Sequence, residues 1–236
     1  MIFPSLDRVK AIAPGYDIVP VYMEILSDVR TPISVLKALK QVSSHTYLLE
    51  SADNSNHWGR YSFLGYDPKI ELFCKNHKMT IKDGTTRTFE CSDPATEIRN
   101  ILSQYKSPRL EELPTFTGGF VGYFACEYIR YIEPTLDFPT PDDNSAMVND
   151  VDLMLFDKVI AFDHYKNKIY LIANISTNDL ERNYNKAELE LKALADLVVN
   201  GKEADIPKGI LKTEFTSEFT KDEFEAVVKK TQHYIK

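Results

Sequence analysis

Residues 69–89 read KIELFCKNHKMTIKDGTTRTF, and this stretch decides the fold class. Every second residue from Ile70 to Cys74 is apolar, which is the pattern of a strand with one buried face. The Asp83-Gly84 pair is a strong signal for a two-residue hairpin turn, and residues 85–89 return as the partner strand. The stretch therefore predicts antiparallel sheet built from hairpins.

Further strand-like runs lie on both sides of this hairpin. Residues 47–49 and 61–64 precede it, and residues 151–162 and 168–175 follow as a long hairpin around 165–167. Strands that come in hairpins, not singly between helices, are not typical of a doubly wound parallel sheet. We therefore predict an α+β fold with antiparallel sheet.

Four helix starts are visible. Thr31-Pro32 and Asp93-Pro94 each place a capping residue before a proline at the first helical position. Asn178 with Glu181 resembles a capping box, and so does Thr220 with Glu223. The last of these helices is well started but reaches Lys236 without a C-terminal cap. Its apolar face either docks on the chain's own domain, or the chain is the front part of a longer protein.

Composition excludes several classes of protein. The 236 residues carry 28 Lys and Arg against 35 Asp and Glu, a net charge of −7, which argues against a nucleic-acid partner. No apolar run reaches the ~18 residues of a membrane helix, and the start of the chain has no signal-peptide pattern. The three cysteines and five histidines show no disulfide framework and no metal-ligand spacing. These observations predict a soluble, cytoplasmic protein without a membrane partner.

Residues 48–51, Leu-Leu-Glu-Ser, form an apolar strand that ends in two polar side chains. Glu50 offers a carboxylate for an ammonium group, and Ser51 offers a donor and an acceptor. Arg60 follows nine positions later and could bind a ligand carboxylate through two hydrogen bonds. Together these groups would suit an amino acid. The alternative is a strand end whose polar side chains are merely solvated.

The glycine-rich residues 118–123, GGFVGY, fail the spacing of both common phosphate-binding loops. We interpret them as a strand in which glycine lets another backbone or a ring approach. No Ser/His/Asp or Cys/His constellation can be defended, so no catalytic residue is predicted in this chain.

Four ordered motifs resemble the N-terminal part of the large subunit (component I) of the anthranilate synthase family. They are Val19-Pro20-Val21-Tyr22 with Asp28 and Thr31-Pro32, the Leu-Leu-Glu-Ser of residues 48–51, the Gly-Arg-Tyr-Ser-Phe-Leu-Gly of residues 59–65, and the glycine strand 118–123 continued by Glu127, Arg130 and Glu133. The likeness spans residues 17–236.

The resemblance implies an α+β fold with antiparallel sheets packed face to face and helices outside. It implies that the full-length subunit is a Mg²⁺-dependent lyase, which converts chorismate to anthranilate and pyruvate for tryptophan biosynthesis. It implies a glutamine amidotransferase partner, component II, that delivers ammonia. The family's chorismate and Mg²⁺ residues lie in its C-terminal part, so the resemblance implies that this chain alone is inactive and binds no metal.

The resemblance also implies a regulatory role. The serine of Leu-Leu-Glu-Ser contacts the feedback inhibitor tryptophan in the family, which makes Ser51, with Glu50 and Arg60, the predicted part of the tryptophan site in this chain. The resemblance implies that another part of that site lies in the family's C-terminal half. Residues 1–209 are predicted as the regulatory domain and residues 210–236 as the start of the chorismate-binding domain. Two alternatives stay open: the same portion of 4-amino-4-deoxychorismate synthase component I, and a free-standing amino-acid-binding module.

Overall fold

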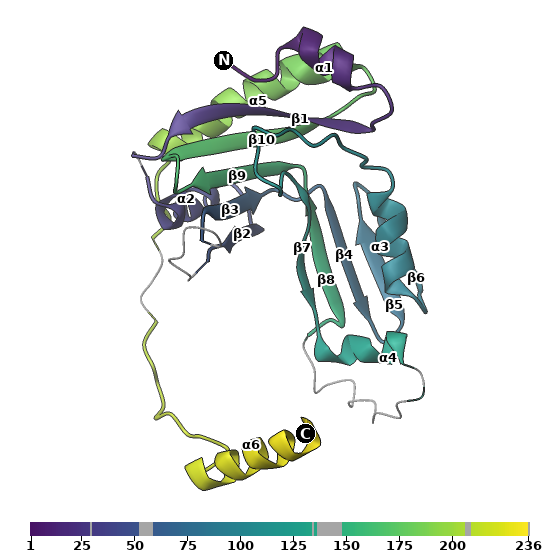
Figure 1. Ribbon diagram of the computed structural model, residues 1–236, viewed down its shortest axis with the longest axis vertical. Coiled ribbons are helices and arrows are strands. Elements are labelled where there is room, and N and C mark those ends of the chain that lie inside the picture. Colours follow the sequence, from purple (N-terminus) through teal and green to yellow (C-terminus); the bar gives the residue numbers. More distant parts are fainter. Residues whose placement is uncertain (29, 52–58, 134, 136–147, 206–208, 236) are drawn as a thin grey trace. The chain divides into compact units, whose positions relative to one another are not determined.

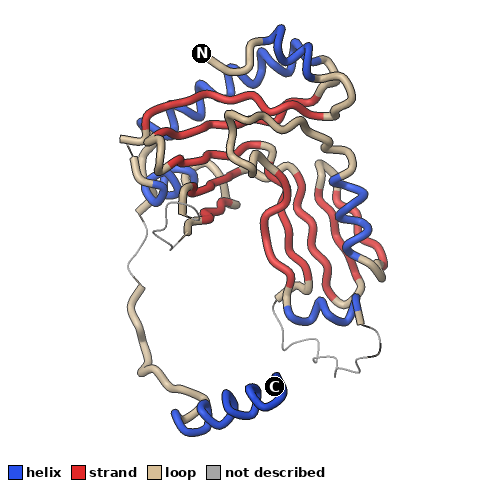
Figure 2. Tube along the Cα trace, viewed as in Figure 1, coloured by secondary structure: helices blue, strands red, loops and turns tan. Residues whose placement is uncertain are grey.

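The computed structural model describes residues 1–28, 30–51, 59–133, 135, 148–205 and 209–235. The chain divides into two compact units, Met1–Ala204 and Asp205–Lys236. The predicted domain boundary after residue 209 lies five residues beyond this division (209 against 204). The first unit holds two antiparallel sheets, and the second holds one helix (Figures 1 and 2).

The first sheet, sheet A, has five antiparallel strands. In spatial order they are β1 (Ile18–Leu26), β10 (Lys168–Ser176), β9 (Lys158–Asp163), β3 (Tyr61–Tyr66) and β2 (Thr46–Leu49). Pro20 lies on edge strand β1 opposite Asn174, whose backbone N–H donates to the carbonyl of Asp157 instead. The proline therefore costs the sheet no ladder hydrogen bond.

The second sheet, sheet B, contains the hairpin that the sequence predicts. Its strands, in spatial order, are β6 (Thr86–Glu90), β5 (Lys78–Lys82), β4 (Ile70–Lys75), β8 (Val151–Phe156) and β7 (Gly119–Phe124). Gly84 lies in the β5–β6 turn with φ +95°, a conformation that glycine adopts without a steric penalty. The apolar residues that alternate from Ile70 to Cys74 are buried, as predicted.

The helices are α1 (Leu6–Ile12), α2 (Pro32–Leu39), α3 (Pro94–Leu102), α4 (Ile129–Ile132), α5 (Leu180–Asn200) and α6 (Lys221–Ile235), with a 3-10 turn at Cys126–Tyr128. The predicted caps of α2, α3 and α6 are confirmed: Thr31, Asp93 and Thr220 each accept a hydrogen bond from the backbone three residues on. The predicted capping box at Asn178 is wrong, because Asp179 occupies the cap position in a left-handed conformation and makes no side-chain cap bond.

Helices cover one face of each sheet (Figure 1). Apolar residues of α1, α2 and α5 form one buried cluster with sheet A, and α3 packs on sheet B. The opposite face of sheet A is covered by the segment around Leu110 and Leu113. The α+β class with two antiparallel sheets is therefore confirmed. The described core residues form separate clusters on the two sheets, not one core between them.

The two sheets are joined through Asp157, the single residue between β8 and β9. The sequence predicts one continuous strand over 151–162, but the structure divides that run between the two sheets. Phe156 packs its ring against Tyr47 of β2 at this junction, with ring centroids 4.7 Å apart. Because β9 begins only at Lys158, residues 174–176 at the end of β10 have no partner in β9.

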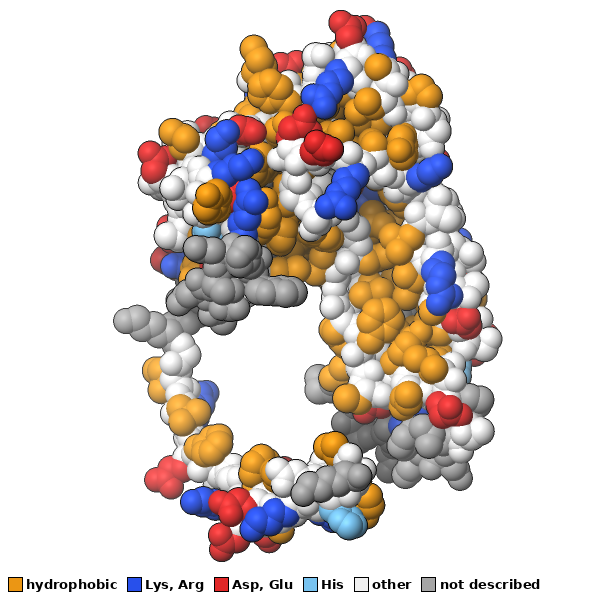
Figure 3. Space-filling view, in the orientation of Figure 1, with side chains coloured by type: hydrophobic (Ala, Val, Ile, Leu, Met, Phe, Trp, Pro, Cys, Tyr) orange, Lys and Arg blue, Asp and Glu red, His pale blue; other side chains and the backbone are white. Residues whose placement is uncertain are grey.

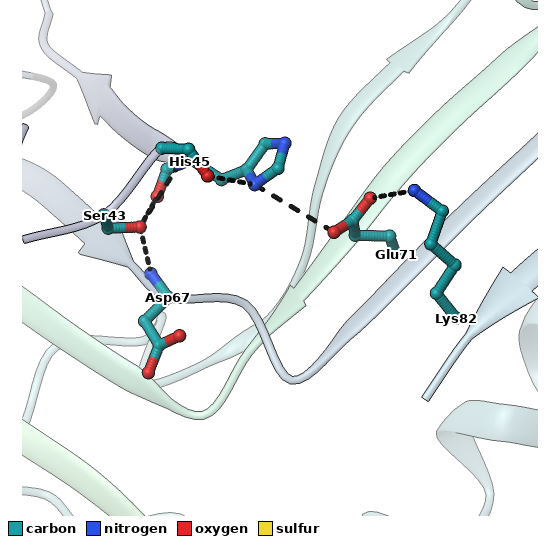
Figure 4. Close-up of polar contacts among 6 residues, drawn as sticks. Ser43, His45, Asp67, Glu71 and Lys82 are labelled. Carbon is teal, nitrogen blue, oxygen red and sulfur yellow. Dashed lines mark hydrogen bonds and ion pairs between the residues drawn. The ribbon is translucent and has the colours of Figure 1, made fainter. Parts of the chain in front are cut away.

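A polar link also joins the sheets (Figure 4). Glu71 of β4 lies between Lys82 of β5, whose Nζ donates at 3.0 Å, and His45 at the start of β2, whose Nδ1 lies 4.0 Å away. Ser43 accepts a hydrogen bond from the backbone N–H of Asp67 at 3.0 Å. Exposed pairs of this kind contribute about 0–1 kcal/mol, so this link adds little to the stability of the chain.

Apolar side chains are exposed at the β7 edge of sheet B and on α4, including Phe124 and Ile132. Figure 3 shows apolar side chains gathered over this part of the molecule. None of the described helices is long and apolar enough to cross a membrane.

Candidate functional site: the end of the β2–β3 pair

The predicted site residues lie at one end of sheet A. Glu50 and Ser51 follow directly after β2, and Arg60 directly precedes β3. Because β2 and β3 are antiparallel, the end of one strand lies beside the start of the other. The structure therefore brings Glu50 and Arg60 to the same end of the sheet. Both Glu50 and Ser51 are exposed there.

Arg60 forms a two-pronged ion pair with Asp163, the last residue of β9. Its Nε donates to Oδ1 at 3.0 Å and its Nη2 donates to Oδ2 at 2.7 Å. Asp163 is completely buried and also accepts hydrogen bonds from the backbone N–H groups of Tyr165 and Lys166. Burial favours the neutral acid, but Arg60 and these N–H groups outweigh it and lower the pKa of Asp163.

This pair changes the role expected of Arg60. Its guanidinium lies over the ring of Tyr61 at 4.8 Å and near that of Tyr165 at 5.6 Å, and its Nε–Nη2 edge is taken by Asp163. A ligand carboxylate would therefore approach Arg60 from the Nη1 side. Through its ion pair with Asp163, Arg60 holds the β9–β10 turn against the start of β3.

A second polar chain runs beside this pair. His164 Nε2 lies 2.7 Å from the hydroxyl of Ser62, and the same hydroxyl lies 3.5 Å from Oε1 of Glu50. Leu49 pairs with Phe63, so Glu50 continues the register opposite Ser62, while Ser62 pairs with Phe162 on the other side. Glu50, Ser62 and His164 therefore lie on one face of neighbouring strands.

Sequence reasoning missed Ser62, Asp163 and His164. A signal for Ser62 was present, because it occupies a core-facing position between Arg60 and Leu64 on a strand that is otherwise apolar on that face. A buried hydroxyl there needs a hydrogen-bond partner. Asp163 and His164 follow a long apolar run and come close to residues 60–62 only through strand pairing. No local pattern could have placed them.

The side chains of this cluster can donate and accept hydrogen bonds and can pair with charged groups. The Ser62 hydroxyl beside an imidazole resembles an activated nucleophile, but Ser62 is only 1% exposed and no substrate can reach it. Glu50 is an acceptor for cationic groups, and exposed Ser51 adds a hydroxyl. No three or more His, Cys, Asp or Glu side chains among the described residues are grouped to hold a metal ion.

The glycine-rich stretch takes the structural role predicted for it. It forms edge strand β7, and a Cβ placed on Gly122 would lie 2.0 Å from the backbone oxygen of Asp152 in β8. A Cβ on Gly118 would lie 2.6 Å from the Asn174 side chain. Glycine is needed here for close backbone approach, and the stretch is not a phosphate loop.

Fold and site together define an α+β module of two antiparallel sheets, with a polar cluster at the end of the β2–β3 pair. The sequence is more specific: residues 45–236 match the chorismate binding enzyme family, and the chain belongs to that family. The match begins well inside the first predicted domain and runs through both.

Proteins that are similar in sequence to this chain have a more specific name than that of the family. Anthranilate synthase component 1 of Acetivibrio thermocellus is 33% identical over the whole of this chain and 49% of that protein. Its counterpart in Acinetobacter calcoaceticus is 38% identical over 78% of this chain and 37% of that protein. The crystal structure of anthranilate synthase component I from Streptococcus pneumoniae TIGR4 gives a TM-score of 0.48 at 24% identity, covering 89% of this chain and 44% of that one. The chain spans about half or less of the length of these proteins.

Proposed function

We propose that this chain is the N-terminal portion of an anthranilate synthase component I. The observation that carries the proposal is the similarity to the Acetivibrio thermocellus protein along the whole chain. The complete protein converts chorismate and ammonia to anthranilate and pyruvate, a lyase reaction of tryptophan biosynthesis in the cytoplasm. A glutamine amidotransferase, component II, supplies the ammonia.

We assign no step of that reaction to the described residues. Among the described residues, no three His, Cys, Asp or Glu side chains are grouped to hold a metal ion, and the proposal places the Mg²⁺ of the complete enzyme in its other half. In the polar cluster at the end of β2 and β3, the hydroxyl that lies beside an imidazole is that of Ser62, which is buried. The proposal therefore includes that the chain alone forms no anthranilate.

The proposed role of the chain is regulatory: tryptophan binds at the end of the β2–β3 pair. Glu50 accepts hydrogen bonds from the ligand ammonium group, while Ser51 and the Nη1 side of Arg60 face the carboxylate. Two features support this role. Glu50 is held beside Ser62 and His164, and Arg60 is fixed by buried Asp163, so two of the three groups are oriented before a ligand arrives.

A chimera tests the proposal. Residues 1–236 replace the matching half of the Acetivibrio thermocellus protein, and anthranilate fluorescence is followed with chorismate, Mg²⁺ and ammonium. We expect activity from the chimera, none from the chain alone, and inhibition of the chimera by tryptophan. Anthranilate formed by the chain alone would contradict the assignment of catalysis to the other half.

Activity of the chimera tests the assignment to the enzyme. If a chimera with normal circular dichroism released no anthranilate, the assignment of this chain to anthranilate synthase would be wrong. If it made anthranilate without responding to tryptophan, the enzyme assignment would stand and the regulatory one would fail.

A further inference from the structure

A polar cavity of about 220 Å³ lies between α5 and the start of β9. One wall is formed by α5, with Asn183, Lys186 and Glu190. The other is formed by the end of β10 with Lys69, Asp157 and Lys158. The cavity exists because β9 begins at Lys158, so residues 174–176 of β10 have no strand beside them on this side.

Charges of both signs line this cavity, and those that form ion pairs do so along one wall, not across the space. On the α5 wall, Lys186 lies 3.5 Å from Glu190. On the other wall, Lys158 lies 3.4 Å from Asp67, which is outside the cavity. Among the described residues, no ion pair within 4 Å joins one wall to the other. The space between the walls separates groups that would otherwise attract one another.

Two charges in the cavity lack an ion-pair partner within the described ranges, Asp157 and Lys69. The Lys69 ammonium instead lies 5.2 Å from the Tyr105 ring. Burial raises the pKa of Asp157, and the neighbouring cations Lys158 and Lys69 only partly oppose this effect. An added positive group beside Asp157 would favour its ionised form.

We propose that this cavity binds a small zwitterion, a free amino acid. The ammonium group of the ligand lies between Asp157 and Glu190. Its carboxylate lies near Lys69, Lys158 and Lys186. The two walls are too far apart for their charged side chains to pair with each other. The ammonium group and the carboxylate of such a ligand would pair with these side chains instead. The predominantly polar lining favours a small hydrophilic side chain over an aromatic one.

The cavity is separate from the tryptophan site proposed above. Asp157 and Lys158 lie at the start of β9, whereas Asp163 ends that strand beside Arg60. Five residues of extended strand span about 17 Å. Binding in the cavity therefore does not depend on the regulatory proposal.

NMR titration of the ¹⁵N-labelled 236-residue chain tests the inference. Glycine and L-serine are the probes, with acetate and methylammonium as single-charge controls. We expect shifts at Asn174, Ser176 and Asn183, and at least about tenfold tighter binding of the zwitterions than of either control, because two charge-assisted contacts replace one. Asp157→Asn and Lys69→Gln should each weaken glycine binding about tenfold or more.

Lys192→Gln is the matched control. Lys192 lies on the same helix, pairs with Glu188 at 2.9 Å as Lys186 does with Glu190, and does not line the cavity. Its variant should bind like the unmodified chain. Asp157→Asn is nearly isosteric, and the amide spectrum reports directly whether it folds.

Two results would overturn the inference. If acetate bound as tightly as glycine and Asp157→Asn strengthened binding, the cavity would be a simple anion site. If no amino acid shifted the cavity resonances at millimolar concentration, the cavity would hold water only.

Discussion

The ring of Tyr47 fills the space above Gly65, its direct partner across the β2–β3 pair. A Cβ placed on Gly65 would lie 2.2 Å from a carbon of that ring. The ring is wedged against Phe156 on its other side, and its buried hydroxyl has no hydrogen-bond partner among the described residues. Burial raises the pKa of the Tyr47 hydroxyl. Glycine at 65 is therefore a packing requirement of the junction between the two sheets.

Gly65→Ala should destabilise the protein by about 1–3 kcal/mol, because the methyl group overpacks a site already filled by an aromatic ring. Urea unfolding measures the loss. Combining it with Tyr47→Leu should recover part of the loss, since the ring is the obstacle. Gly209→Ala is the control, because nothing lies within 4 Å of a Cβ there. Equal stability of Gly65→Ala and the parent chain would show that the ring is not held in place.

Asp163→Ala should destabilise the chain by about 3 kcal/mol, near the lower end for a broken buried ion pair, because Arg60 keeps some contact with solvent. The β9–β10 turn would also lose the two backbone N–H bonds that Asp163 accepts. Glu112→Ala, which breaks an exposed pair with Arg8, should cost no more than about 1 kcal/mol. If both variants lost similar amounts of unfolding free energy, the buried pair of Asp163 would contribute no more to stability than an exposed pair does.

The same pair predicts a pH dependence. The pKa of Asp163 is lower in the folded chain than the unfolded value of about 3.9. The ionised group therefore contributes its full stabilisation above about pH 4, and this contribution is lost as the pH falls through the lower folded pKa. The difference in unfolding free energy between the parent chain and Asp163→Asn should be constant near neutral pH and shrink in acid. A difference that grew on acidification would have the wrong sign.

Much of the fold follows from local signals in the sequence. Proline after Thr31 and Asp93 marks the starts of α2 and α3, and Asp83-Gly84 marks the turn of a hairpin. Those features depend on neighbours in the chain, which a pattern can reveal. The division of the predicted strand 151–162 at Asp157 depends on which strands pair with each half, and no local pattern encodes it.

The candidate site, too, could be predicted only in part from local sequence patterns. Glu50, Ser51 and Arg60 stand out as polar residues at strand ends, and the structure brings the first and last of them to one end of the sheet. The partners that orient them come from β9, more than a hundred residues later, so only strand pairing reveals Asp163 and His164.

Helix α6 should be weakly protected from amide exchange. It has 15 residues, and isolated helices of about this length are marginal in water. None of its described residues is buried, and Phe224 and Val227 of its apolar face are 61% and 51% exposed. Hydrogen exchange over residues 222–234 should therefore be fast compared with that around buried Leu191 of α5. Strong protection of α6 in a demonstrated monomer would contradict this expectation.

Ser51 offers the sharpest test of regulation, in the chimera described above. Ser51→Ala should remove the hydrogen bond that we propose between Ser51 and the inhibitor, which is worth about 1–3 kcal/mol or roughly 5–150-fold in the tryptophan inhibition constant. Ser51→Phe should weaken inhibition further, because its ring would also occupy the ligand's space.

The rate without tryptophan should be unchanged in both variants, since regulation and catalysis are coupled but separate properties. Ser44→Phe is the matched control, because Ser44 is an exposed serine before the other end of β2. It should leave both the rate and the inhibition constant as they are. If Ser51→Phe kept the tryptophan inhibition constant within about twofold, a difference below 0.5 kcal/mol, Ser51 would be only the polar end of a strand.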